Sequence, residues 1–261
     1  MKLFLDKVHN NKIAEAIAEF DLIQKNDKIL VGLSGGKDSS FLLYALKVLS
    51  QHTSLNFDVQ AVSVDLGFKE SNHIPYLEAL CEKLEVNLDI IETEIAKYII
   101  NENSDNPCAK CAHFKKGAIV DYMNKKGFEK LAFGHHYDDA VETFLMSIFY
   151  SGQVNTLQPK RFLSNNEVYI IRPLIYLREK RIIAAKERIG YDDSFIKCPY
   201  DEHTKREEIK NILKKVKFNK QIFYNIAAAM RENSIKEMWP DKLGEEILTN
   251  KIESIWNSDK N

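Results

Sequence analysis

Short apolar runs alternate with longer amphipathic segments along the first 190 residues of the chain. The apolar runs have the length of buried strands and cover residues 27–33, 57–66, 86–92, 130–134 and 168–172. Around them, apolar side chains recur at helical spacing over residues 11–25, 41–49, 74–84, 111–126, 139–150 and 178–189. Strands that alternate with helices in this way favour right-handed crossovers. We therefore expect an α/β fold, with a parallel twisted sheet and helices on both faces.

The pattern becomes purely helical after residue 200. Apolar positions with helical spacing cover residues 205–217, 219–231 and 242–256. This change predicts two parts, a main domain of residues 1–200 that includes an N-terminal helix, and a small helical C-terminal extension of residues 201–261.

Composition narrows the class of protein. Hydrophobic residues make up 44% of the chain and charged residues 29%, as in ordinary soluble globular proteins. No stretch approaches about 18 uninterrupted apolar residues, and Asp6 interrupts the N-terminal apolar segment too early for a signal peptide. We expect a cytoplasmic protein that does not bind a membrane.

The net charge of −1 hides an asymmetry between one segment and the rest of the chain. Residues 160–220 carry 16 Lys and Arg against 9 Asp and Glu. Such a segment can bind a polyanion such as RNA, although it can equally be a mixed, solvated helical surface. The candidates for contacts with a phosphate backbone are Arg172, Arg178, Arg181, Lys205 and Arg206. Tyr169, Tyr176 and Phe195 lie among them and could stack on bases or pack in the core.

A glycine-rich loop directly follows the first predicted strand. It has the sequence Ser34-Gly35-Gly36-Lys37-Asp38-Ser39 and opens the next helix. Adjacent glycines let the backbone approach a phosphate chain, the helix N-terminus offers N–H groups and a positive dipole, and Lys37 supplies a cation. The spacing is that of neither a Walker A loop nor a GxGxxG loop. The loop therefore predicts a phosphate-binding site of a different type.

Three polar loops follow strands of the predicted sheet. Besides the glycine-rich loop, Asp65 ends the second strand and residues 134–139 follow the fourth. The carboxyl ends of parallel strands lie at one edge of a sheet, where ligands of such folds bind. We expect the loops to converge there, and Asp139 could be the N-cap of the helix that follows.

Four cysteines occur, at positions 81, 108, 111 and 198. Cys108 and Cys111 form a CxxC pair at the start of a predicted helix, a setting that favours the thiolate form. Such a pair fits a redox couple, an iron–sulfur site or half of a zinc site, and His113 or His203 could complete zinc coordination. Cys81 lies on the apolar side of its helix, where we expect a buried core thiol.

The glycine-rich loop resembles the SGGxDS signature of the PP-loop ATP pyrophosphatases. The resemblance implies an ATP-binding catalytic domain that cleaves ATP between the α and β phosphates, adenylates a substrate oxygen and lets a nucleophile displace AMP. It also implies catalytic roles for Lys37, on the phosphates, and for Asp38, on Mg²⁺. The implied nucleotide-binding residues are Ser34, Gly35, Gly36, Lys37, Asp38, Ser39, Asp65 and Gly134. From the residues alone, Asp65 could equally cap a helix or form a turn.

A longer series of motifs is similar to the tRNA 2-thiocytidine synthetase family. In order, they are the PP-loop, the CxxC pair, Gly134-His135-His136-Tyr137-Asp138-Asp139, Arg172-Pro173-Leu174 and Cys198-Pro199. This resemblance implies a [4Fe–4S] cluster on Cys108, Cys111 and Cys198, with one iron open to carry sulfur. It also implies that Asp139 acts at the reacting base or the Mg²⁺. One departure is Asp201, which stands where the best-known members have a further cysteine.

These resemblances imply an ATP-dependent tRNA sulfurtransferase. It would adenylate the C2 oxygen of a pyrimidine, a cytidine of the anticodon loop, and replace that oxygen with sulfur, releasing AMP and pyrophosphate. Its partners would be tRNA and either sulfide or a sulfur donor protein. Three alternatives stay open: a tRNA lysidine synthetase-like ligase, a PP-loop thiolase acting on a substrate other than tRNA, and a nucleotide-binding module whose cysteines hold structural zinc.

Two groups of side chains admit more than one interpretation. Lys115 and Lys116, one turn past Cys111, could face the cluster, the RNA or solvent. A homodimer interface or internal packing would account equally for Phe149, Tyr150, Trp239 and Trp256.

Overall fold

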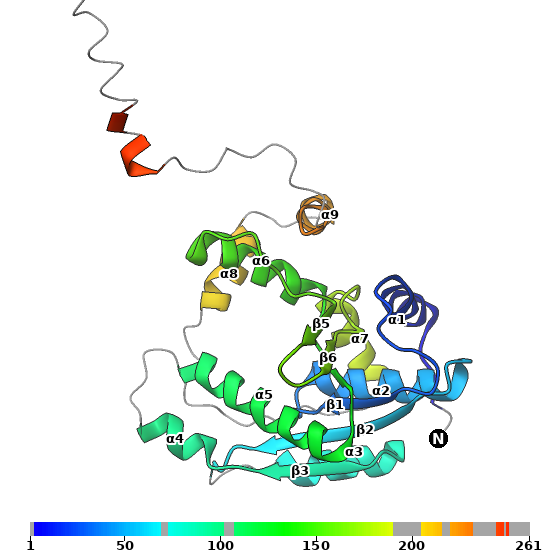
Figure 1. Cartoon of the computed structure of the whole chain (residues 1–261). Helices are drawn as coiled ribbons and strands as arrows, with labels where there is room; N and C mark the ends of the chain where they lie inside the picture. The colour runs from blue at the N-terminus through cyan, green and yellow to red at the C-terminus, as the bar shows by residue number, and fades with distance from the viewer. Residues whose placement is uncertain are drawn as a thin grey trace, which may run out of the picture. The chain divides into compact units, whose positions relative to one another are not determined.

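Six strands of the described residues form one sheet, in the order β3-β2-β1-β4-β6-β5, in the computed structural model of the chain (Figure 1). They are β1 (Lys28–Gly32), β2 (Asp58–Asp65), β3 (Leu88–Glu92), β4 (Lys130–Ala132), β5 (Lys160–Leu163) and β6 (Val168–Ile171). The strands from β3 to β6 pair in parallel, and β5 pairs antiparallel with β6 at the edge. This arrangement confirms the expected α/β fold with a largely parallel sheet.

The structure describes residues 3–68, 73–101, 107–189, 205–215, 220–231, 244–247 and 249–250. Their helices are α1 (Lys7–Glu19), α2 (Lys37–His52), α3 (His73–Leu84), α4 (Ile95–Asn101), α5 (Pro107–Lys126), α6 (Tyr137–Ser151), α7 (Glu179–Ile189), α8 (Lys205–Lys215) and α9 (Lys220–Ala229). The chain divides into two compact units, Met1–Asn219 with the sheet and Lys220–Asn261 with α9. None of the helices in the described ranges is long and apolar enough to span a membrane.

Several predictions concern residues outside the described ranges. The expected domain boundary near residue 200 is one of them, and it stays a prediction. The side chains in question are Phe195, Cys198, Asp201, His203, Trp239 and Trp256.

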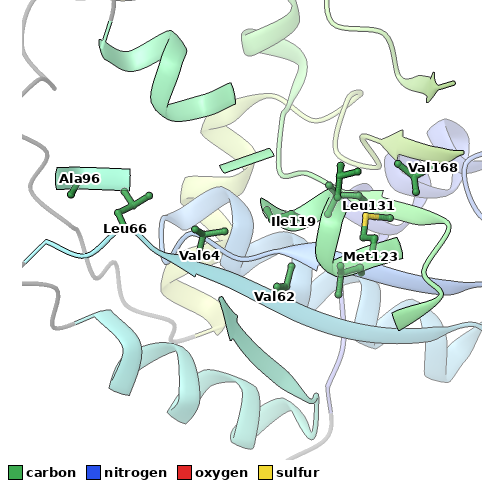
Figure 2. Packing of buried hydrophobic residues seen from close by; sticks show 10 residues of the cluster. Val62, Val64, Leu66, Ala96, Ile119, Met123, Leu131 and Val168 are labelled. Carbon is green, nitrogen blue, oxygen red and sulfur yellow. The ribbon is translucent and has the colours of Figure 1, made fainter. Parts of the chain in front are cut away.

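Buried side chains cover both faces of the sheet. On one face, Val62 and Leu131 belong to a cluster that includes Met123 of α5 (Figure 2). Successive residues of a strand point to opposite faces, so Ile29 and Val31 of β1, both fully buried, lie on the other face, where α2 packs. A sheet buried on both faces explains the continuous apolar runs in the sequence. It also leaves the carboxyl edge as the place for the polar loops.

The first helix differs from its prediction at both ends. It begins at Lys7, because the Asp6 carboxylate accepts hydrogen bonds from the amides of Val8 and His9 and caps it. It ends at Glu19, and Asp21 has a φ of 48°, in the left-handed region that a helix cannot contain. The helix α4 and the strand β5 were not predicted.

Candidate active site

The glycine-rich loop lies between the end of β1 and the first turn of α2. Hydrogen bonds of its serines stabilise the conformation of the loop. The Ser39 hydroxyl donates to the Gly36 carbonyl (3.1 Å) and accepts from the Ser34 amide (3.2 Å). Gly35 has a φ of 83°, in the region that favours glycine. Gly36 is the N-cap of α2, and no side chain of the described residues caps the helix there. The first amides of α2 and its dipole are therefore available to an anion such as a phosphate.

Lys37 stands at this loop between two carboxylates. Its Nζ lies 2.9 Å from Asp38 Oδ2 and 3.0 Å from Oε1 of Glu179, the first residue of α7. Burial by itself would lower the pKa of Lys37, but the carboxylates of Asp38 and Glu179 raise it above its ordinary value. The lysine is therefore held as a cation. Sequence analysis missed Glu179, whose only local signal is its place in the first turn of a predicted helix.

The Asp38 carboxylate is half-buried, and one of its two oxygens lacks a hydrogen bond within the described residues. Its Oδ1 has no hydrogen-bond partner among the described residues, and His136 Nε2 lies 3.8 Å away. Burial raises the pKa of Asp38 above its ordinary value, while His136 and Lys37 oppose this rise. A carboxylate oxygen without a donor suits Mg²⁺, which is usually held by one or two carboxylates together with water and phosphate oxygens. The described part of the chain contains no group of three or more His, Cys, Asp or Glu side chains that could hold a metal ion.

The loop after β4 packs directly against the start of α2. A Cβ on Gly134 would lie 2.8 Å from the backbone carbonyl of Asp38 and 2.9 Å from the amide nitrogen of Ser39. At the next helix, the His136 amide donates to Asp139 Oδ2 (2.9 Å) and the Asp139 amide donates to His136 Nδ1 (3.4 Å). This capping box makes His136, rather than Asp139, the N-cap of α6. Two of the three polar loops therefore meet.

Gly134→Ala is expected to push these two loops apart. The added methyl group would overlap backbone atoms, so we expect the free energy of unfolding to fall by about 1–3 kcal/mol and the affinity for ATP to fall with it. Thermal unfolding and ATP titration measure the two effects. Gly117→Ala on α5 is the matched control, because a Cβ there meets nothing within 4 Å. A Gly134→Ala protein as stable as that control would contradict the close approach.

Two of the basic residues considered for RNA contacts are bound to carboxylates of the same site. Arg178 Nη2 lies 2.9 Å from Asp138 Oδ1, and Asp138 Oδ2 also accepts the Glu179 amide (2.7 Å). Arg206 of α8 donates to Asp139 Oδ1 at 2.7 Å. These contacts tie α7 and α8 to the first turn of α6.

The helix α8 also neutralises a carboxylate one turn further along α6. Glu142 is buried, with Arg206 Nη1 3.6 Å from one of its oxygens and Lys210 Nζ 4.0 Å from the other. Burial raises the pKa of Glu142 to about 7, and Lys210 and Arg206 oppose the rise. Burial acts in the same direction on Asp139, but His136 above all holds the pKa of Asp139 below its ordinary value. Asp139 is thus ionised at neutral pH, where Glu142 titrates.

The other three basic candidates have different surroundings. Arg172 is buried, and its Nη1 donates to a backbone carbonyl (2.5 Å) while its Nε donates to His135 Nδ1 (3.3 Å). Burial lowers the pKa of Arg172 to about 10 and that of His135 to about 4. Arg181 and Lys205 are exposed, and Lys205 Nζ lies 5.0 Å from the ring centroid of Tyr150. RNA contacts by any of the five basic residues remain a prediction.

Asp65 forms a turn at the carboxyl end of β2. Its Oδ1 accepts the Gly67 amide (2.9 Å), and its carbonyl accepts both the amide (3.0 Å) and the hydroxyl (2.7 Å) of Thr93. Because β2 pairs in parallel with β1, Asp65 lies on the same edge of the sheet as the glycine-rich loop. A contact with the nucleotide remains a prediction.

The CxxC pair lies in the first turn of α5. Cys108 is exposed, and Cys111 is half-buried against a cluster that includes Leu66, just beyond the carboxyl end of β2. Two thiols one turn apart on a helix can bind one metal centre, and this pair lies at the sheet edge that carries the glycine-rich loop. The third predicted ligand, Cys198, is outside the described residues. Cys81 is buried in α3, where burial raises the pKa of its thiol to about 11, and this confirms the expected core thiol.

The chain is similar to known proteins over most of its length. The family model described as a PP-loop domain matches residues 5–218. A tRNA-cytidine(32) 2-sulfurtransferase of Marinomonas sp. (strain MWYL1) is 34% identical over 208 residues, which cover 77% of this chain and 73% of that protein. A protein of the same name from Pelobacter propionicus is 32% identical over 212 residues, covering 78% and 77%. The solved structure of the U34-tRNA thiolase NcsA from Methanococcus maripaludis with its [4Fe-4S] cluster has the same fold. Its TM-score is 0.72 at 22% identity, covering 91% of this chain and 81% of that one.

Proposed function

Because the chain belongs to the PP-loop domain family and, within it, to the tRNA 2-thiocytidine synthetase family of enzymes, we propose that it is an ATP-dependent tRNA thiolase. The proposed target is a cytidine of the anticodon loop, in line with the names of its relatives. The observation that carries the proposal is one shared sheet edge. Lys37 with its glycine-rich loop and the turn with Cys108 and Cys111 both lie at the carboxyl ends of β1 and β2.

In the proposed reaction, the C2 oxygen of the base attacks the α-phosphorus of ATP, and pyrophosphate leaves. Lys37 and the first amides of α2 stabilise the charge on the phosphates. Asp38 and Glu179 keep the lysine charged and hold it at the loop. A sulfur nucleophile then bonds to C2, and the C2–O bond breaks as AMP departs with the oxygen.

Two carboxylates of the site are suited to bind Mg²⁺ or to contact the reacting base. The Asp38 Oδ1 atom, which no donor satisfies among the described residues, would bind Mg²⁺ directly or through water. Asp139 is fixed by the His136 amide and by Arg206, so its carboxylate keeps one orientation. We assign it to the reacting base or to the Mg²⁺.

Cys108, Cys111 and Cys198 would hold the [4Fe–4S] cluster. The described part of this donor set fits, because an exposed and a half-buried thiol lie one turn apart. When bound, the cluster supplies an open iron position that carries the sulfur to be transferred. The contribution of α5 is to bring its two thiols to the edge where the nucleotide loop lies.

Incubation of anaerobically purified protein with tRNA, ATP, Mg²⁺ and sulfide tests the proposed function. We expect 2-thiocytidine in the digested tRNA by mass spectrometry, and one AMP for each sulfur incorporated. A transcript with uridine in place of the target cytidine is the matched control. Lysine attachment coupled to AMP formation would instead identify a lysidine synthetase. Bound zinc without acid-labile sulfide would assign the cysteines to a structural site.

A further inference from the structure

The helix α4 packs against α5 (Figure 1). Three aromatic rings lie together at the surface of these two helices. The rings of Tyr98 and Phe114 meet edge to face with centroids 5.1 Å apart, and the His113 ring lies 5.9 Å from that of Phe114. Tyr98 is 47% exposed and Phe114 is 36% exposed, so a large part of each ring contacts solvent. Single exposed aromatic residues are ordinary, but three adjacent rings form a surface that can receive another planar group.

The same two helices are basic around these rings. Residues 95–101 and 107–120 contain four lysines and no Asp or Glu. One of these lysines, Lys97, pairs with Glu94 at 3.4 Å. Lys115 and Lys116 are half-buried and have no ion-pair partner within the described residues. Lys115 follows Phe114 directly, and Lys116 follows His113 by one helical turn, so the lysines lie next to the rings around this part of α5. We call the surface region of Tyr98, His113, Phe114, Lys115 and Lys116 the aromatic–lysine face.

The charge of this face contrasts with that of three basic residues in the segment 160–220. There, Arg178 and Arg206 are already paired with Asp138 and Asp139, and Arg172 is buried. A cation that is neutralised inside the protein contributes little to the attraction of a polyanion. Lys115 and Lys116 have no ion-pair partner within the described residues, so they are better suited to a phosphate backbone than Arg172, Arg178 and Arg206 are.

The position of the face relates it to the proposed chemistry. Phe114 follows Cys111 by one helical turn, so the two residues lie on the same side of α5. Cys111 itself packs against the cluster that includes Leu66, which lies just beyond the carboxyl end of β2. A nucleotide that contacts Phe114 would therefore lie beside the turn that carries the thiols.

We propose that the aromatic–lysine face binds unpaired nucleotides of the tRNA loop that contains the target base. Tyr98 and Phe114 stack on bases, and Lys115 and Lys116 contact the adjoining phosphates. Stacking suits this role because every base has a π face, so the platform can hold the loop without selecting its sequence. The inference rests on the proposed function, for which it names the place where the RNA binds.

Binding of a fluorescent anticodon stem-loop RNA to the full-length holoprotein tests this inference. For Tyr98→Leu/Phe114→Leu we expect the Kd for RNA, and the KM for tRNA, to rise about tenfold or more, while the KM for ATP is unchanged. Phe162→Leu is the matched control, because Phe162 is 49% exposed on β5, at the opposite edge of the sheet. For Lys115→Gln/Lys116→Gln, the slope of log Kd against log salt should decrease by about 1.4. This second variant leaves the ring packing intact and tests the same face if the first does not fold.

The outcomes separate this inference from the proposed function. A wild-type protein that thiolates tRNA, together with ring and lysine variants that bind RNA as tightly as the Phe162→Leu control, overturns the aromatic–lysine face alone. Variants that bind RNA normally but no longer accept sulfur from a donor protein would assign the face to a protein partner, which also overturns it. A wild-type protein that neither binds nor thiolates tRNA overturns the proposed function and this inference with it.

Discussion

Cys108→Ala is expected to abolish iron loading and tRNA thiolation together. Cys108 is exposed in the first turn of α5, one turn from Cys111, and a cluster on three thiolates cannot lose one without losing its attachment. The protein should still fold, because an exposed side chain contributes little to stability. Iron and acid-labile sulfide content of anaerobically purified protein, followed by nucleoside analysis of the tRNA, measures both effects.

Cys81→Ala is the matched control for this loss. Cys81 is buried among the apolar side chains of α3, and its substitution should cost about 1 kcal/mol of stability through a small cavity. Its iron content should equal that of the wild type. A Cys108→Ala protein with full iron and sulfide content, or one that thiolates tRNA at the wild-type rate, would contradict the assignment of Cys108 to the cluster.

The strands and helices that were predicted are those with a strong local pattern. The inner strand β1 is buried on both faces, so its sequence, KILVG, contains a continuous apolar run. The strand β5 has the sequence KRFL and lies at the edge of the sheet with Arg161 and Phe162 exposed, so no buried apolar run marks it in the sequence. The helix α4 has the sequence IAKYIIN and is only two turns long, too short for a helical period to be recognised. Its β-branched and aromatic residues also do not favour a helix. Tertiary packing against α5, which no local pattern records, stabilises it.

In the candidate site too, the sequence revealed only features that depend on neighbouring residues. The glycine-rich loop could be recognised because its residues are contiguous and their chemistry depends on the local backbone. Glu179 could not, since it meets Lys37 from a helix 142 positions later in the chain. Arg206 is a similar case, because its charge counted towards a basic segment while its partner, Asp139, lies 67 positions earlier. Composition counts charges, but only the fold decides which of them are already paired.

Lys37→Met is expected to reduce pyrophosphate release from ATP in the presence of tRNA by roughly 100- to 1,000-fold, because it removes a positioned cation from the phosphates. The remaining carboxylates of Asp38 and Glu179 would then repel the nucleotide, so the KM for ATP should rise as kcat falls. A pyrophosphate assay at saturating tRNA separates the two constants. The iron content should not change, because Lys37 lies outside the cysteine turn.

Two control variants distinguish the charge of Lys37 from its placement. Glu179→Gln removes one partner but leaves Lys37 paired with Asp38 at 2.9 Å, so we expect a loss in kcat well below that of Lys37→Met. Lys12→Met removes an exposed lysine that pairs with Glu15 on α1, and it should have no effect on kcat or KM. Wild-type pyrophosphate release by Lys37→Met would show that the amides of α2 bind the phosphates without the lysine. A loss in Glu179→Gln as large as that in Lys37→Met would mean that Lys37 acts only in the orientation that both carboxylates impose.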